Sequence, residues 1–309
     1  MDILLLILGL AMILIGANYM TDGAAALAAR LNVSEFIIGL TIVAIGTSAP
    51  EMVVSIISAM NGSGDIAVGN VVGSNIFNTL LILGICAVVR PVALTQRNIF
   101  RDIPLGIVAS LVLLLVSFGG EITRWFGLLL LVLYIGVIIY SIRSSRPSIE
   151  EVEAAESTPK MALWLALVMV VGGLATLIYG GDLLLENAIS IAHRYSIPDN
   201  VIAITMLAGG TSMPELAASL VSLIKGKSDI ALGNVIGSNI ANILLVLGAS
   251  ASISPLTLGA VTNIDMGVVL LSSVLLFLAA FTFQRREIDR IEGVLFLAIF
   301  FGYIYYLVG

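Results

Sequence analysis

The chain has 309 residues, of which 59% are hydrophobic and only 11% are charged. A soluble protein of this length would carry roughly 25% charged residues, so this composition excludes an ordinary soluble domain. The formal net charge of −6 says little about partners. Apolar runs of about 20 residues follow one another along the chain, which indicates an integral multi-pass membrane protein built from helices.

Hydrophobic segments follow one another in two sets of five. In chain order they lie at residues 3–29, 34–60, 66–89, 98–119 and 125–142, and then at 161–193, 197–224, 230–252, 263–283 and 288–308. The acidic, hydrophilic stretch 144–160 separates the two sets and is typical of a solvated linker. We therefore expect an all-α membrane protein with a first repeat at 1–143 and a second repeat at 161–309.

Two sequences recur in the second half of the chain, shifted by 164 positions. The string GTSAPEMVVS at 46–55 returns as GTSMPELAAS at 210–219. The string DIAVGNVVGSNIFNTLLILG at 65–84 returns without a gap as DIALGNVIGSNIANILLVLG at 229–248. Because each half has an odd number of spans, the second half enters the membrane in the opposite sense. This is the inverted-repeat plan of secondary transporters, with ten transmembrane helices in two five-helix repeats.

The basic residues support this number of helices. In the ten-helix arrangement, 12 of the 14 basic residues lie on one face of the membrane: Arg30, Arg90, Arg97, Arg101, Arg143, Arg146, Lys160, Lys225, Lys227, Arg285, Arg286 and Arg290. The opposite face holds only Arg124 and Arg194. By the positive-inside rule, the first face is cytoplasmic and both termini lie outside.

Each GTSxPE string places a proline and a glutamate near the middle of a predicted membrane helix. The proline cannot donate to the carbonyl four residues earlier, that of Gly46 or Gly210, and it opens that turn. An ionised carboxylate at this depth costs at least ~2.5–3.5 kcal/mol, so Glu51 and Glu215 are expected to be functional. If the repeats face each other, a shared Ca²⁺ or Na⁺ would cancel the two charges and complete its shell with carbonyl and hydroxyl oxygens.

The second repeated string adds polar side chains on one helix face. Residues at positions i, i+4 and i+8 share a face, and here they are Asn70, Ser74 and Asn78 in the first half and Asn234, Ser238 and Asn242 in the second. Glycines also recur at four-residue spacing and would let this helix approach a neighbour closely: Gly69, Gly73, Gly233 and Gly237. We therefore expect this helix to lie beside the glutamates.

The paired motifs resemble those of the sodium/calcium exchangers, a family of the calcium/cation antiporter superfamily. The α-repeats of that family carry G-T-S-x-P-[ED] followed by G-N-x-x-G-S-N, and both strings stand in both halves of this chain. The resemblance covers the whole chain in length, repeat spacing and ten-helix plan. It implies that helices 2, 3, 7 and 8 surround the ions and that helices 1 and 6 slide past them during alternating access.

The resemblance also implies the ion-binding residues. The carboxylates shared by calcium and sodium match Glu51 and Glu215, and the backbone carbonyls that bind calcium match Thr47 and Thr211. The surroundings of the sodium sites match Ala44, Ala208, Ser48, Ser74, Ser212 and Ser238, and the central polar pair matches Asn78 and Asn242. Potassium-dependent relatives carry Asp at the second position of that pair, so Asn242 lowers the case for potassium cotransport without excluding it.

We thus expect a minimal prokaryotic exchanger of the plasma membrane that moves sodium against calcium. Its expected partners are the two ions and the lipid bilayer, with no cofactor, no enzymatic activity and no nucleic acid; the sequence leaves the oligomeric state open. A proton- or potassium-coupled cation antiporter is an alternative, although Val71 and Val235 stand where the proton-coupled branch has an acidic residue. A further alternative is an intramembrane hydrolase that uses the two glutamates as an acid/base dyad.

Overall fold

The structure is a computed structural model that describes residues 2–144, 161–194, 210–259, 261–282 and 286–308. These residues belong to two compact units, and each unit takes segments from both halves of the sequence. Unit 1 is drawn from Met1–Pro50 and Ser144–Asn234, and unit 2 from Glu51–Arg143 and Val235–Gly309. Nearly all of the acidic linker expected at 144–160 lies outside the described residues.

The described part of the chain is mostly helical and strongly apolar, as expected. It contains seven helices that are long and apolar enough to cross a membrane, or eight if Glu35–Thr47 and Ala49–Met60 form one bent span. Two shorter apolar helices, Met213–Ile224 and Asn263–Ala279, lie within further segments where the sequence predicts spans. The chain is therefore an integral multi-pass membrane protein.

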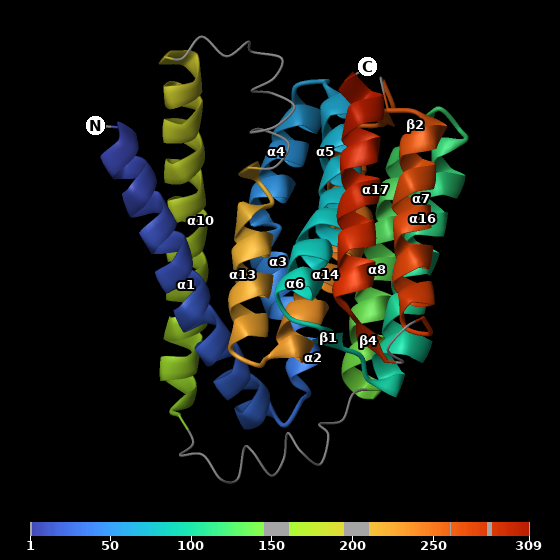
Figure 1. The fold of residues 1–309 in the computed structure, drawn as a ribbon. Coiled ribbons are helices and arrows are strands. Elements are labelled where there is room, and N and C mark those ends of the chain that lie inside the picture. Colours follow the sequence, from blue (N-terminus) through green and yellow to red (C-terminus); the bar gives the residue numbers. More distant parts are fainter. Residues whose placement is uncertain (1, 145–160, 195–209, 260, 283–285, 309) are drawn as a thin grey trace. The chain divides into compact units, whose positions relative to one another are not determined.

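Unit 1 contains two long helices that pack along each other in opposite directions (Figure 1). Its described elements are α1 (Asp2–Leu31), α2 (Glu35–Ile38), the π-helix η1 (Gly39–Val43), α3 (Ala44–Thr47), α10 (Leu163–Arg194), α13 (Met213–Ile224) and the start of α14 (Ser228–Ala241). Glycines spaced seven residues apart on α1 face the backbone of α10. A Cβ atom on Gly16 would lie only 2.6 Å from the backbone nitrogen of Leu177, so the two backbones touch at this point.

The helices α13 and α14 of unit 1 are held by a second close contact and by ion pairs. A Cβ atom on Gly39 would lie 2.6 Å from the carbonyl oxygen of Ile230, and Gly233 meets the same stretch of backbone from α14. Lys225, next to the end of α13, forms an ion pair of 2.6 Å with Asp22 of α1. Of the four glycines expected to pack closely, Gly233 does so, whereas a Cβ atom on Gly73 would meet nothing within 4 Å.

Unit 2 contains the remaining helices. They are α4 (Ala49–Met60), which begins at the end of a unit 1 segment, α5 (Gly64–Ile76), η2 (Phe77–Ile82), α6 (Leu83–Val89), η3 (Asn98–Asp102), α7 (Ile103–Ser117), α8 (Arg124–Ser144), η5 (Asn242–Val246), α15 (Leu247–Ile253), α16 (Asn263–Ala279) and α17 (Arg290–Val308). The helix α17 packs on α6 where Gly84 meets Gly293, and α8 packs on α15 where Gly127 meets Ala251. Equivalent helix pairs of the two repeats thus approach each other closely at a glycine.

Four strands of two residues each, which the sequence did not predict, join the ends of helices in unit 2. The strand β1 (Val92–Ala93) pairs antiparallel with β4 (Glu287–Ile288), and β2 (Glu121–Ile122) pairs antiparallel with β3 (Leu256–Thr257). Each pair takes one strand from each half of the sequence. Pairing satisfies backbone groups that a buried turn would otherwise leave without partners.

Candidate ion-binding residues

The first GTSxPE motif interrupts its helix just before the proline, and in the second motif a helix begins just before the proline. The helix α3 ends at Thr47, Ser48 has φ of −80° and ψ of 8°, and α4 begins at Ala49. In the second motif, Ser212 has φ of −90° and ψ of 6°, and α13 begins at Met213. We expected one opened turn inside a continuous helix; instead, a new helix begins. Proline has no N–H to bond to the preceding turn and fits the first turn of a helix, which explains the restart.

This restart places each glutamate in the first turn of a helix. Glu51 lies in the first turn of α4 and is 0% exposed, and Glu215 lies in the first turn of α13 and is 1% exposed. The partial positive charge of a helix N-terminus favours a carboxylate by about 0.3–2 kcal/mol. The effective penalty for burying one ion is several kcal/mol, so the helix alone does not balance a buried charge.

In unit 1, the two GTSxPE motifs meet. The hydroxyl of Ser48 donates to Oε1 of Glu215 at 3.1 Å. The other carboxylate oxygen, Oε2, is buried and has no hydrogen-bond partner within the described residues. One oxygen of this carboxylate is thus anchored, and the other is available to a cation.

The neighbouring Thr47 is also buried and hydrogen-bonded. Its hydroxyl lies 3.3 Å from the carbonyl oxygen of Ala44 and 3.1 Å from Oδ1 of Asn234, and it donates its proton toward these acceptors. The other predicted ligands in this unit are Ala44 and Ser212, which are buried, and Thr211, which is partly buried. Ala208 lies outside the described residues.

In unit 2, the backbone carbonyl of Glu51 accepts a hydrogen bond from the G-N-x-x-G-S-N string of the first repeat. The amide Nδ2 of Asn70 donates to the carbonyl oxygen of Glu51 at 3.1 Å and to the hydroxyl of Ser55 at 3.0 Å. The remaining predicted residues of this unit are all buried: Ser74, Asn78, Ser238 and Asn242. The G-N-x-x-G-S-N string therefore lies beside Glu51 within this unit, as its polar face predicts.

Three buried amides of unit 2 have unused hydrogen-bonding capacity: those of Asn75, Asn78 and Asn242. The Nδ2 atom of Asn242 donates to Oδ1 of Asn75 at 3.4 Å, whereas Oδ1 of Asn242 has no partner in the described part of the chain. The same holds for Nδ2 of Asn75 and for both amide atoms of Asn78. Buried polar groups are nearly always satisfied. The amide oxygens of Asn78 and Asn242 therefore suit a hard cation or its water.

Each repeat has a π-helical segment that begins at or just before the asparagine, Asn78 in the first repeat and Asn242 in the second. The segment η2 spans Phe77–Ile82 and η5 spans Asn242–Val246. Shifted by 164 positions, the second segment corresponds to residues 78–82, so the two nearly coincide. Short π-helical turns are rare and occur frequently at functional sites. The sequence shows the asparagines but gives no signal for this change of helix type.

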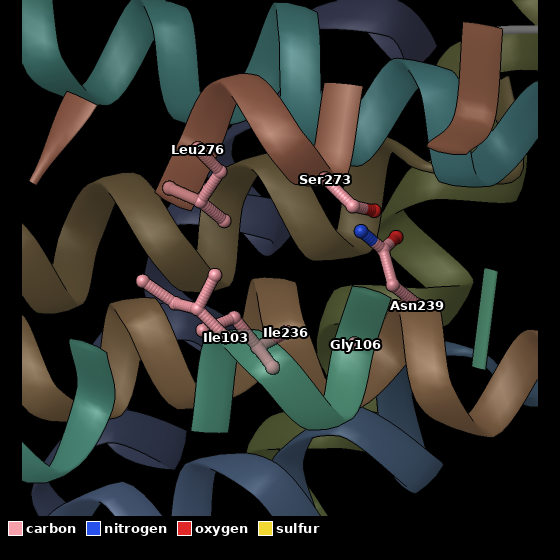
Figure 2. Close-up of a pocket in the computed structure, with 6 residues that line it drawn as sticks. All are labelled: Ile103, Gly106, Ile236, Asn239, Ser273 and Leu276. Atoms are coloured by element: carbon pink, nitrogen blue, oxygen red, sulfur yellow. The ribbon is translucent and has the colours of Figure 1, made fainter. Parts of the chain in front are cut away.

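One further asparagine, Asn239, lines a small cavity of unit 2 (Figure 2). The cavity measures about 10 Å³ and is lined by Ile103, Gly106, Ile236, Asn239, Ser273 and Leu276. Figure 2 shows the Asn239 amide beside the Ser273 hydroxyl. This volume accommodates about one water molecule.

Comparison with known proteins matches both halves of the chain. The family model described as "Sodium/calcium exchanger protein" matches residues 1–143 and 165–309. The "Putative antiporter CaxA" of Alkalimonas amylolytica is 40% identical, covering 97% of each chain. The "Sodium/calcium exchanger MaX1" of Methanosarcina acetivorans is 30% identical, covering 98% of this chain and 97% of the relative.

A solved structure shares the fold. It is the sodium-calcium exchanger NCX_Mj soaked with Na⁺ and Ca²⁺, which is 31% identical, with a TM-score of 0.86 over 98% of this chain and 97% of the other. The family consists of transporters, so the protein is not an enzyme and the hydrolase alternative is discarded. With its buried glutamates and repeated motifs, the chain belongs to the sodium/calcium exchanger family.

Proposed function

We propose that this protein is a secondary antiporter that moves calcium out of the cell against sodium by alternating access. The observation that carries the proposal is the buried carboxylate of Glu215, which is anchored by Ser48 at one oxygen and has its other oxygen without a partner in the described residues. A carboxylate of this kind binds hard cations through oxygen and offers no soft ligand for copper or zinc. The family assignment points to the same two ions.

The charges explain why one ion releases the other. We propose that Glu51 and Glu215 both bind calcium and sodium, assisted by the remaining predicted ligands. Crossing the membrane with bare carboxylates would be costly, so the protein changes its access only when cations balance their charge. Calcium and sodium compete for the same oxygens, and occupancy by one therefore displaces the other. The arrangement of both carboxylates around one ion stays a prediction from the inverted repeat.

The topology that we propose has ten transmembrane helices in two inverted repeats, 1–143 and 161–309, joined by a cytoplasmic linker at 144–160. The support is the distribution of basic residues, which favours a prokaryotic plasma membrane protein with both termini outside. The seven or eight spans found among the described residues agree with this plan as far as they extend. Cysteine labelling from outside at positions 2 and 308 tests the location of the termini.

The driving ion distinguishes this proposal from its alternatives. In a proton-coupled antiporter, the same glutamates would exchange calcium for protons, and a pH gradient would drive the flux. In a potassium-coupled antiporter, calcium flux would need potassium. The deciding experiment measures calcium flux in proteoliposomes under an imposed sodium, proton or potassium gradient at clamped voltage. We expect the sodium gradient alone to suffice.

A further inference from the structure

We propose that Asn234 is a positioning residue that holds the calcium-binding carboxylate of Glu215 in place, and that Asn70 does the same for Glu51. The inference rests on the proposed function and adds two residues to it. Neither asparagine belongs to the ligand set inferred from the sequence.

The side chain of Asn234 makes three hydrogen bonds within unit 1. Its Nδ2 donates to the carbonyl oxygen of Glu215 at 3.3 Å and to the hydroxyl of Ser219 at 2.9 Å. Its Oδ1 accepts from the hydroxyl of Thr47 at 3.1 Å. The residue is 0% exposed. Because both amide hydrogens are used and the amide oxygen is held by Thr47, Asn234 acts through its neighbours.

These bonds connect three helices around one carboxylate. Thr47 ends α3, Glu215 lies in the first turn of α13, and Asn234 lies on α14. Ser48, the residue after Thr47, bonds the carboxylate of the same glutamate at 3.1 Å. The side chain of Glu215 is therefore held by Ser48 and its backbone by Asn234, so the four residues form a closed network. Contacts of this kind orient the groups that bind an ion.

The network needs a side chain that both donates and accepts. An amide supplies two N–H donors and one acceptor oxygen, whereas an ionised aspartate only accepts. Aspartate at position 234 would turn a second acceptor toward the carbonyl oxygen of Glu215 and add a negative charge. Alanine would leave the Thr47 hydroxyl and the Glu215 carbonyl without these bonds.

The same contact occurs independently in unit 2. Asn70 donates to the carbonyl oxygen of Glu51, 19 positions earlier, and to Ser55, 15 positions earlier. Asn234 donates to Glu215 and Ser219 across the same two separations. The contact thus occurs twice, once inside each unit. This indicates that it is a feature of the repeat and does not depend on one local environment.

The test measures equilibrium calcium binding to the purified, detergent-solubilised full chain by isothermal titration. The variants are Asn234→Ala and Asn70→Ala, and the matched control is Asn187→Ala. Asn187 is also buried in unit 1, and it donates to a carbonyl of its own helix α10, that of Leu183 at 2.7 Å. We expect the calcium dissociation constant to rise by about tenfold or more in the two test variants, because loss of a supporting contact costs about 10–100-fold in metal affinity. The control should match the wild type.

Two results overturn the inference: an unchanged dissociation constant in monodisperse Asn234→Ala, or an equal rise in Asn187→Ala. If Asn234→Ala does not fold, Ser219→Ala replaces it, because it removes only one of the three bonds. This variant should weaken calcium binding by a smaller factor, and unchanged binding would also overturn the inference. If the wild type binds no calcium and shows no sodium-driven flux, the proposed function itself fails, which is a separate outcome.

Discussion

The hydroxyl of Ser48 donates a hydrogen bond of 3.1 Å to Oε1 of Glu215, although 167 positions separate the two residues in the chain. Each belongs to a GTSxPE motif, one from each repeat, and both lie in unit 1. The serine that interrupts one helix thus supports the glutamate that opens another. In unit 1 the first motif therefore supplies part of the surroundings of the glutamate in the second motif.

Replacing Ser48 with alanine should weaken calcium binding without unfolding the protein. The substitution removes the donor that anchors Oε1 of Glu215, and a hydrogen bond to a charged group is worth about 1.5–3 kcal/mol. We expect the apparent KM for calcium in proteoliposomes to rise by roughly tenfold, which corresponds to the lower part of that range. The control is Ser222→Ala, which removes a buried hydrogen bond of 2.9 Å to Thr21 in the same unit. Equal KM values for Ser48→Ala and the wild type would contradict this role.

Glu51→Gln and Glu215→Gln should each abolish calcium transport. Each substitution keeps the shape of the buried side chain but removes the charge that calcium needs for neutralisation. Glu121→Gln changes an exposed glutamate in β2 and should leave transport intact. Calcium uptake under a sodium gradient is the measurement. Wild-type rates in either of the first two variants would show that its carboxylate does not bind the ion.

Calcium flux driven by sodium should be the same in potassium-free medium. Asn78 and Asn242 are neutral, so in the proposed site the two glutamates alone would balance one calcium. An additional obligatory potassium would lie in a low-dielectric interior without a counter-charge, which costs several kcal/mol. Asn242→Asp adds a carboxylate and should create a potassium response or tighten sodium binding. The voltage is clamped without valinomycin. Loss of wild-type calcium flux in potassium-free medium would refute the conclusion that the neutral Asn242 makes potassium unnecessary.

Two ion pairs of equal length should differ greatly in their effect on stability. Arg101 Nε lies 2.6 Å from Asp102, and both side chains are almost fully buried. Asp102→Asn leaves a buried guanidinium without its counter-charge, so we expect a loss of about 3–5 kcal/mol.

The comparison pair is Lys225 and Asp22, also 2.6 Å apart, whose side chains are 27% and 52% exposed. Asp22→Asn should cost no more than about 1 kcal/mol, because solvent screens this pair. Thermal unfolding in detergent measures both variants. Similar losses for the two would show that burial does not set the value of these pairs.

The sequence predicted the helices well because membrane spans leave a simple signal. Apolar runs near 20 residues marked the described helices, and the repeated motifs identified Glu215 and Ser48, which the structure brings together. The helix face shared by Asn70, Ser74 and Asn78 was expected to lie beside the glutamate. The side chain of Asn70 indeed donates a hydrogen bond to the backbone carbonyl oxygen of Glu51.

Other features have no such signal. The helix restart after Ser48 depends on how one proline is accommodated, and the same sequence is equally compatible with a kink inside a continuous helix. The π-helical turns near Asn78 and at Asn242 have no signature in local residue propensities, which tertiary context can override. The bonds of Asn234 to Thr47 and Glu215 join three segments distant in sequence. Spacing along one helix cannot reveal them, since it only says which side chains share a face.

Calcium flux in proteoliposomes under opposed gradients tests the central claim most directly. Vesicles with wild-type protein are loaded with sodium and diluted into sodium-free medium that contains radioactive calcium, at clamped voltage and equal pH. We predict rapid calcium uptake that stops when the sodium gradient is dissipated and that is absent in Glu215→Gln. Uptake that ignores the sodium gradient but follows an imposed pH gradient would contradict sodium/calcium exchange and favour proton coupling.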